Sequence, residues 1–407
     1  MANSISDLRP AFWAREAQRS LFVENKAMAI ANTTLRNIVA GEGDTVHRTI
    51  ISYPASATYT PGSDITNRTV TGSKETLSIS TWLASKVTVD DTEKRQSVIE
   101  LATNISNKMM KDHNNRIEQA VLAEVTSALW TLDDGNVSGT SGNNAIVNTN
   151  TVPQFFIAAD TKLDAIDAPK AGRTAVVGGH FLGQLKLQQA ARATVFGDGV
   201  NTRGVVANLF GWDILYSNNL PWSATLTIDT QPTDGDTFTI AGVVFTFKTT
   251  QGTTAGNINI CASAATTLDN VVTTFADLAT TVAEATDAGY QAISDENIFL
   301  LRDKRRITAT EATSTTISFA GYGDVVVSET FAAATNVFSA QRQDSLFAVK
   351  GCVDIIVQIP PKIEVTRDPD QFSDIIKSLL GYGKKTYADG AREMVRVKID
   401  ASQSDWS

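Results

Sequence analysis

The longest helical pattern in the chain covers residues 90–131, DDTEKRQSVIELATNISNKMMKDHNNRIEQAVLAEVTSALWT. Asp90 offers an N-cap carboxylate and Glu93 follows three positions later, which is the arrangement of a capping box. Apolar residues then repeat every three or four positions as far as Leu129, and neither proline nor glycine interrupts them. The pattern predicts one long helix, which we expect to be the main rod of its domain.

Two runs of alternating polarity precede the helix, at 45–53 and 77–89, and both are rich in β-branched residues. The turn-rich segment 54–64 lies between them, so the pattern predicts a long hairpin over 45–89. An isolated two-stranded ribbon is marginal in water, and this one has few apolar residues. We therefore expect another chain to cover it. Residues 1–44 are predicted to be an arm with a short helix around Phe12 and Leu21, whose apolar face must lie on something else.

After the long helix the chain alternates helical and extended patterns. A long stretch of unusual composition interrupts them. Periodicity predicts helices at 152–163, 181–191 and 371–380, strands at 173–178, 210–217, 353–359, 363–366 and 394–399, and a turn at 381–383. The stretch of unusual composition covers 222–340, where 13 acidic residues face 5 basic ones and 25 threonines occur. Such a shift indicates an inserted domain. We expect it to be mainly β, with a hairpin turning at Ala241 and Gly242, a helix over 267–282, and short strands around Phe299, Ile307, Ile317 and Val326.

Composition excludes several classes of protein. The 407 residues carry a net charge of −9 and are 42% hydrophobic and 19% charged, as in ordinary globular proteins. No apolar run is long enough to span a bilayer, and the N-terminal residues lack the pattern of a signal peptide. Two cysteines are too few for a disulfide framework, so we expect the chain to be made in a reducing cytoplasm. No basic stripe of the kind that binds nucleic acid is present.

Several residues invite a reading as functional sites, and each also has a plainer explanation. The segments 197–199 and 381–383 complete no phosphate-binding motif and are interpreted as turns. His113 is expected to be a lone surface histidine, and Cys352 an inert thiol beside an apolar strand. Asp133 and Asp134 are weak evidence for a cation site. The three histidines, His47, His113 and His180, are not spaced as metal ligands. The cluster 302–306, Arg-Asp-Lys-Arg-Arg, is either a solvated turn or a patch facing acidic groups of a neighbouring subunit.

The order of these elements resembles the major capsid protein of tailed bacteriophages, which has the Hong Kong 97 fold. Five segments outside the insertion carry the resemblance: 43–46 (GDTV), 88–93 (TVDDTE) with Gln96, 211–221 (GWDILYSNNLP), 364–369 (EVTRDP) with Phe372, and 381–385 (GYGKK). The insertion resembles the extra domain of podovirus-type coats, and its segment 234–247 (DGDTFTIAGVVFTF) is similar to add-on β modules of phage structural proteins.

The resemblance implies an α+β capsid fold with defined domains. These are an N-terminal arm (1–44), an E-loop hairpin (45–89), the spine helix and peripheral domain (90–150), the first part of the axial domain (151–221), the inserted acidic domain (222–340) and a return segment (341–407). The E-loop would lie over the spine helix of a neighbouring subunit.

The implied function is structural. Hexamers and pentamers of the chain would form an icosahedral head around double-stranded DNA, without sequence-specific contacts, in a virion assembled in the host cytoplasm. A portal protein is an expected partner. No fused scaffold precedes the arm, so a separate scaffolding protein is expected too. We expect no enzymatic activity, no catalytic, cofactor-binding or metal-binding residues, no cofactor and no membrane contact. The alternatives are a tail-tube or adhesin component and, less favoured, a cytoplasmic enzyme with a β accessory domain.

Overall fold

The computed structural model describes residues 26–34, 45–51, 56, 58–65, 67, 69–96, 101–137, 140–141, 144–190, 208–250, 252–280, 289–340 and 343–400. The helix predicted within 1–44 and the turn predicted at 197–199 lie outside these residues. The chain forms two compact units, one holding Ala31–Val121 and Gly351–Gly390, the other holding Leu122–Lys350 and the chain from Ala391. Among the described residues, every helix is too short or too polar to cross a membrane.

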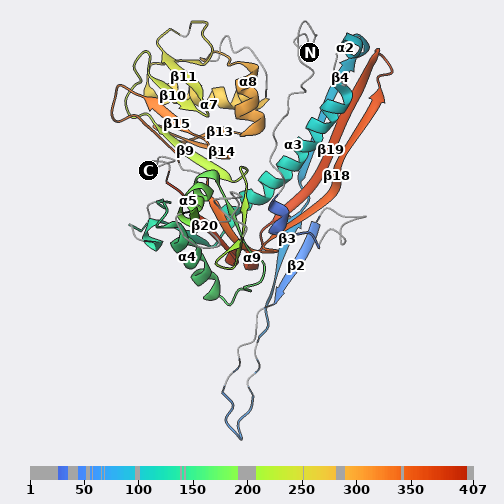
Figure 1. Ribbon diagram of the computed structural model, residues 1–407, viewed down its shortest axis with the longest axis vertical. Helices are drawn as coiled ribbons and strands as arrows, with labels where there is room; N and C mark the ends of the chain where they lie inside the picture. The colour runs from blue at the N-terminus through green and yellow to red at the C-terminus, as the bar shows by residue number, and fades with distance from the viewer. Residues whose placement is uncertain are drawn as a thin grey trace. The chain divides into compact units, whose positions relative to one another are not determined.

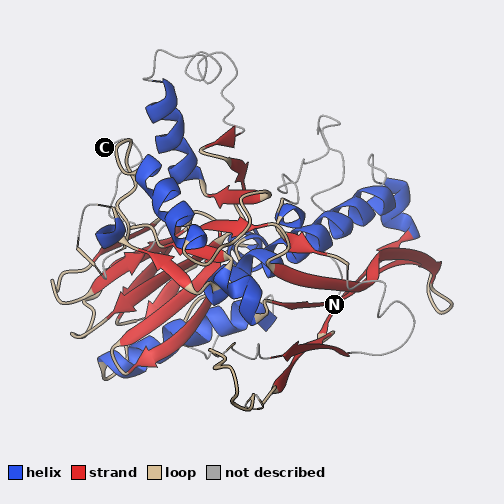
Figure 2. Ribbon diagram, turned by 90° about the horizontal axis from the view of Figure 1, so that it is seen from below, coloured by secondary structure: helices blue, strands red, loops and turns tan. Residues whose placement is uncertain are grey.

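The first unit is built on a four-stranded sheet in the order β1-β18-β19-β4. Its strands are β1 (Ala31–Asn32), β18 (Val353–Arg367), β19 (Ser373–Lys385) and β4 (Thr81–Asp90). The helices α2 (Asp91–Gln96) and α3 (Leu101–Ala123) follow β4. α3 lies along one face of the sheet (Figures 1 and 2), where Ile105 and Met109 pack near Val89 and Ile376. The amphipathic spacing of the predicted rod is thus explained by its contact with the sheet.

The predicted long helix is confirmed at its N-terminal end and is wrong at its C-terminal end. At the N-terminus the capping residue is confirmed, because the Asp90 carboxylate accepts hydrogen bonds from the backbone N–H and the hydroxyl of Thr92. At the other end the prediction is wrong. α3 stops at Ala123, a 3-10 turn η3 (Glu124–Ser127) follows, and β5 (Trp130–Leu132) pairs with the strand β20 (Met394–Val397). Pairing with a strand far along the sequence overrides the local helical period.

The predicted hairpin is confirmed over half of its length. β2 (Thr45–Ile51) pairs with β3 (Gly72–Ser78) in a separate antiparallel ribbon, which extends away from the sheet of its unit (Figure 1). The second alternating run does not continue in this ribbon. It breaks after Ser78, and its remainder is β4, which pairs with β19 along its whole length. Alternation alone cannot say which partner a strand takes.

The helix predicted at 371–380 and the turn predicted at 381–383 are both wrong, because these residues form β19. The spacing of Ile375, Ile376 and Leu379 imitates a helical period. The strand lies between β18 and β4, and in its described length only Lys377 and Leu379 are exposed. Its two glycines serve close approach: a Cβ on Gly381 would meet the Trp82 ring at 2.4 Å, and one on Gly383 would meet the Ser78 carbonyl oxygen at 2.5 Å.

The strands predicted on either side of Pro360 and Pro361 are one continuous strand, β18. Register shifts against β19 occur between Val357 and Ile359 and between Ile359 and Lys362. β1 pairs with β18 only at its start, so the prolines lie on an edge strand, where a missing N–H breaks no ladder.

The second unit contains a six-stranded sheet in the order β5-β20-β17-β6-β8-β7. Its other strands are β17 (Ser345–Val349), β6 (Arg173–Val177), β8 (Trp212–Tyr216) and β7 (Asn208–Leu209), and its helices are α4 (Val152–Asp164) and α5 (Gly179–Ala190). The helices and strands predicted between 152 and 217 are confirmed, except that Phe210 stands in the turn between β7 and β8 with a positive φ of 53°. Aromatic rings fill the core, with Phe347 edge-on to both Phe156 and Trp212.

Residues 221–340 form two four-stranded sheets and a helix around a core of their own. The first sheet has the order β12-β11-β10-β15 and the second β13-β14-β9-β16. The strands are β9 (Pro221–Thr227), β10 (Thr237–Ile240), β11 (Val243–Lys248), β12 (Asn257–Asn259), β13 (Thr308–Thr313), β14 (Thr316–Tyr322), β15 (Val327–Thr330) and β16 (Val337–Ala340), and the helices are α7 (Ala264–Thr280), α8 (Asp295–Ile298) and the π-helical turn η5 (Phe299–Lys304).

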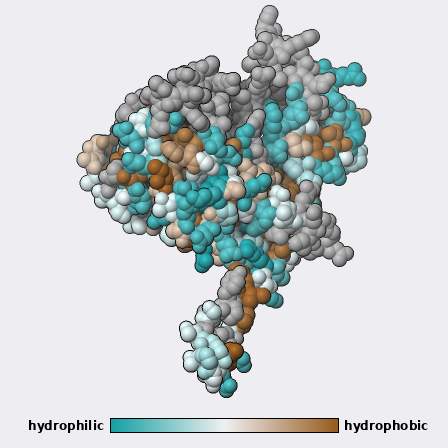
Figure 3. Space-filling view, turned by 60° about the horizontal axis from the view of Figure 1, so that its bottom comes forward, coloured by the Kyte–Doolittle hydropathy of each residue, from teal (hydrophilic) through white to brown (hydrophobic). Residues whose placement is uncertain are grey.

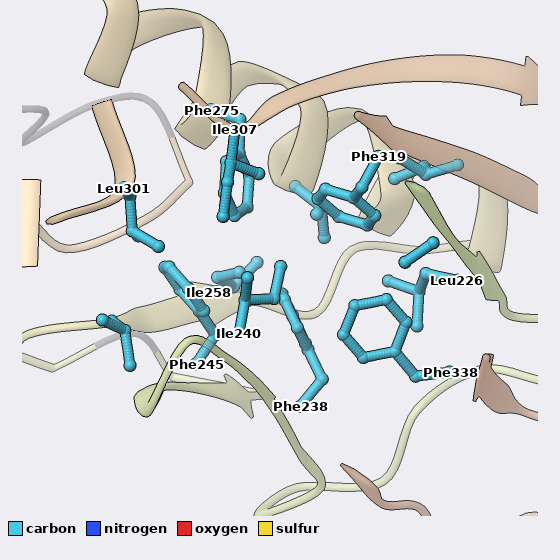
Figure 4. Packing of buried hydrophobic residues seen from close by; sticks show 14 of the residues in the cluster. Leu226, Phe238, Ile240, Phe245, Ile258, Phe275, Leu301, Ile307, Phe319 and Phe338 are labelled. Carbon is cyan, nitrogen blue, oxygen red and sulfur yellow. The ribbon is translucent and has the colours of Figure 1, made fainter. Parts of the chain in front are cut away.

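This core joins both sheets to α7 (Figure 4). Phe238 and Phe245 stack on the β10–β11 hairpin, and Phe275 of α7 meets Phe319 of β14 edge-on at 5.0 Å. The predicted hairpin and helix are confirmed. Phe299, predicted in a strand, begins η5 instead, while Ile307 and Val326 stand just before strands. The buried residues of this core form a cluster separate from that of the six-stranded sheet.

A fragment covering 222–340 is therefore expected to fold alone. It keeps its hairpin, both sheets and α7, and these enclose one apolar core. The fragment should melt cooperatively in circular dichroism, with a heat capacity change in proportion to its size. A spectrum of disordered chain would show that the core requires the six-stranded sheet.

Candidate functional site

The base of the β2–β3 hairpin is fastened to the segment 387–389. Arg48 of β2 and Glu75 of β3 stand directly opposite each other in the ladder. The Arg48 guanidinium pairs with the Asp389 carboxylate at 2.5 Å and lies 5.2 Å from the centre of the Tyr387 ring. Glu75 accepts a hydrogen bond from the Ala388 backbone N–H at 3.3 Å. Each strand therefore contacts the same short segment.

Buried side chains support this attachment from beneath. Val46, Leu77, Ile79, Ile356 and Tyr387 form one apolar cluster that joins the ribbon to the sheet of its unit. Burial raises the pKa of the Tyr387 hydroxyl, which has no hydrogen-bond partner among the described residues. The hairpin base is a fixed joint rather than a loose tether.

Beyond its base the hairpin exposes apolar side chains. Ile51, Tyr59, Ile65 and Val70 are 62, 58, 82 and 52% exposed, and Figure 3 shows brown hydrophobic surface on this extended part. A ribbon of two strands has no interior in which to bury them. An exposed apolar surface on an extended element is typical of a contact with another chain.

The far end of the sheet carries a network of ion pairs beside an exposed ring. Arg367 of β18 binds both carboxylate oxygens of Asp91 and reaches Asp374 at 3.2 Å, while Lys94 pairs with Asp374 at 2.6 Å. The Arg367 hydrogen bonds hold the pKa of Asp91 below its usual range, and the Lys94 bond does the same for Asp374. This network fixes the turn between β18 and β19, where Phe372 is 82% exposed.

The histidines and the cysteine named in the sequence analysis each lie in a structural environment that, in the part of the chain the structure describes, gives no sign of a metal or catalytic site. His113 lies on α3 as expected, but it is buried, and burial lowers its pKa. The prediction of a surface histidine is wrong because His113 is one turn before Ile117, on the buried face of the helix. Cys352 is buried, in agreement with prediction. His47 contacts the Thr76 hydroxyl and His180 the Val147 carbonyl. Among the described residues, no three His, Cys, Asp or Glu side chains gather as a metal site requires.

The two charged clusters also take part in local structure. Asp133 and Asn136 form a capping box for the 3-10 turn η4 (Asp134–Asn136), and Asp134 accepts the Thr140 N–H. The prediction of a solvated turn at 302–306 is wrong for its second half. Arg302 pairs with its neighbour Asp303 at the surface, but burial lowers the pKa of Arg305, which faces Asp324.

A buried ion pair stands where the chain returns from 222–340 to the six-stranded sheet. Asp344 donates its N–H to the Pro221 carbonyl, and its carboxylate accepts bonds from Arg396 of β20 at 2.6 and 2.8 Å. Burial raises the pKa of Asp344 to about 6, against the opposing effect of Arg396. The segment that enters residues 222–340 at Pro221 and the segment that leaves them at Asp344 are thus bonded to each other, and Asp344 is also bonded to β20.

This raised pKa predicts a pH dependence that Asp344→Asn removes. Protonation is favoured in the folded state, so the stabilising contribution is complete below pH 4 and is lost as pH rises through about 6. The wild type should lose roughly 3 kcal/mol of unfolding free energy more than the variant between pH 4 and 7. Urea unfolding at both pH values measures this, with the exposed Asp229→Asn as control. Parallel pH profiles for wild type and Asp344→Asn would contradict it.

Sequence reasoning missed the residues of the hairpin base. Arg48 and Asp389 are separated by 341 positions, so no spacing rule connects them. The facing of Arg48 and Glu75 could have been found by counting the hairpin register. No local signal indicates that Tyr387 would be buried against them.

Comparison with known proteins shows which solved structures have a similar fold. No protein-family model matches the chain, and no curated protein matches it. Among solved structures, a chain from Mycobacterium phage Che8 is 14% identical with a TM-score of 0.56, over 95% of this chain and 96% of that one. A chain of the capsid of the cyanophage P-SCSP1u is 13% identical with a TM-score of 0.54, over 99% and 96%. At this level of identity the likeness concerns the fold alone, and the fold of the chain is that of a phage capsid protein.

Proposed function

We propose that the chain is the major capsid protein of a tailed bacteriophage, a structural protein without enzymatic activity. The observation that carries the proposal is the near-complete coverage of a phage capsid chain in both directions. The hairpin supports it independently, since a fixed base with an apolar exposed end suits a contact between subunits. In the Hong Kong 97 arrangement, β2–β3 is the E-loop, α3 the spine helix, the six-stranded sheet the axial domain, and 222–340 a podovirus-type insertion.

In this proposal hexamers and pentamers of the chain form the icosahedral head of the virion around double-stranded DNA. Purified full-length chain, examined by negative-stain electron microscopy, should give shells of irregular size or unassembled subunits, because no scaffold sets the curvature. Tubes would favour the tail-tube alternative, and small particles even with the scaffolding protein added would contradict a shell-forming role. A separate scaffolding protein and a portal are proposed partners. Uniform shells from this chain alone, unchanged by salt, would exclude a need for scaffold.

The hairpin should also become more ordered on assembly. As an E-loop it would lie on a neighbouring subunit, so backbone amides of β2 and β3 should exchange hydrogen more slowly in shells than in the free chain. The amides of β6, buried in both states, serve as the internal reference. Equal exchange of the hairpin amides in both samples would show that the hairpin is not an assembly element.

A further inference from the structure

The sheet of the first unit has a second face, opposite α3, that carries a net positive charge. β4 and β19 pair without a register break from Thr81–Tyr382 to Asp90–Ser373. Because Val87 and Val89 point to α3, alternation puts the even-numbered residues of β4 on the other face. That face, here called the lysine face, consists of Trp82, Ala84, Lys86, Lys377 and Leu379.

Two lysines of this face oppose each other directly. Lys86 of β4 is the ladder partner of Lys377 of β19, and both side chains are exposed. Like charges directly opposite each other destabilise a sheet. Glu364 of β18 is the ladder partner of Lys377 on its other side and attracts it, while the Glu364 carboxylate forms an ion pair with Lys362 at 2.5 Å. Neither Lys86 nor Lys377 forms an ion pair with a described residue, so the repulsion between the two lysines is only partly offset, and an anionic group of a partner would relieve it.

The rest of the lysine face is apolar. The Trp82 ring lies on Gly381, with ring atoms 2.4 to 3.1 Å from the position a Cβ would take there, which fixes the indole while leaving it 51% exposed. Leu379 is 38% exposed beside it. A nucleic acid backbone would neutralise the lysines but would leave this apolar part in water. A protein partner with an acidic rim and an apolar centre fits both halves.

The chain itself contains such a surface at the turn 295–299. Asp295 and Glu296 of α8 are exposed and have no ion pair with a described residue, and Phe299 is 47% exposed. Spacings of three and four positions put Phe299 on the side of the helical turn that Asp295 and Glu296 occupy. This acidic turn matches the lysine face in kind and number: two carboxylates for two ammonium groups, and one ring for the apolar part.

We propose that the lysine face of one copy binds the acidic turn of a second copy. The contact would be heterologous, which is the kind that extends into a closed shell. The inference rests on the proposed shell-forming function and names a partner surface for it. Each exposed ion pair is weak, but repetition over many subunits makes the sum effective.

Charge reversal in the full-length chain tests the contact. Lys86→Glu with Lys377→Glu, and separately Asp295→Lys with Glu296→Lys, should each raise the protein concentration required for assembly by about tenfold or more. Combining all four substitutions should restore assembly close to the wild-type concentration, because both charges are exchanged. Thermal melting of the unassembled chains confirms that each variant is folded, and the neutral pair Lys86→Gln with Lys377→Gln replaces any that is not.

The outcomes separate the contact from the proposed function. Normal assembly of the lysine variant, or no rescue in the combined variant, overturns the contact while leaving the capsid function intact. A lysine variant that assembles normally but binds short double-stranded DNA more weakly assigns the face to nucleic acid and also overturns it. If the wild type forms no shells even with the scaffolding protein added, the proposed function fails. The contact can then still be measured by sedimentation as salt-dependent self-association of the chain. That self-association should be lost in each pair variant and regained in the combined variant.

Discussion

Replacing Arg173 with alanine is expected to lower the free energy of unfolding of the second unit by about 3 kcal/mol. The Arg173 side chain is only 2% exposed. Its guanidinium pairs with Asp160 and Asp164 of α4 and donates to the carbonyls of Ala168 and Pro169 at 3.0 and 3.1 Å. Alanine would leave these carbonyls without a donor and would detach α4 from β6.

The measurement is urea unfolding followed by circular dichroism, with two matched variants. Arg173→Lys keeps the charge but loses the forked geometry, so it should lie between wild type and alanine. Arg302→Ala removes a surface arginine paired with its own neighbour and should cost less than about 1 kcal/mol. Equal losses for Arg173→Ala and Arg302→Ala would show that the buried network does not hold this unit together.

The sequence predicts well the elements that have a clear local period. α4, β6, α5 and the β10–β11 hairpin each have one, and their propensity agrees with their burial, although β6 takes the distant β17 as a ladder partner. The resemblance to a phage capsid fold could be stated because these elements occur in a recognisable order. A local pattern identifies such an element, although it does not give the partner of a strand.

Prediction failed where a partner distant in the sequence determines the structure of a segment. Residues 371–380 have a helical spacing, yet β18 and β4 are available on both sides, and β19 forms between them. The glycines at 381 and 383 suggested a turn, although their role is close approach to Trp82 and Ser78. The hairpin base joins Arg48 to Asp389 across most of the chain. Such contacts follow from topology, which periodicity does not contain.

The largest functional effect should follow from removing the outer part of the hairpin. Ile51 and Gly72 are the last ladder partners of β2 and β3, so a two-residue Asn-Gly turn can replace residues 52–71 with the geometry of a tight hairpin. The base remains, with Arg48 bound to Asp389 and Tyr387 buried. Stability should therefore change by no more than about 0.5 kcal/mol, whereas assembly into shells should be abolished.

A second variant separates the length of the hairpin from its apolar surface. A Gly/Ser segment of equal length in place of 52–71 keeps the reach but removes Tyr59, Ile65 and Val70. If apolar contact drives assembly, this variant should fail as completely as the short one, because a polar chain gains nothing by burial against a neighbour. Light scattering and negative-stain images at matched concentrations measure both. Shells from the short variant would remove the hairpin from the assembly mechanism, and shells from the Gly/Ser variant alone would reduce its role to that of a spacer.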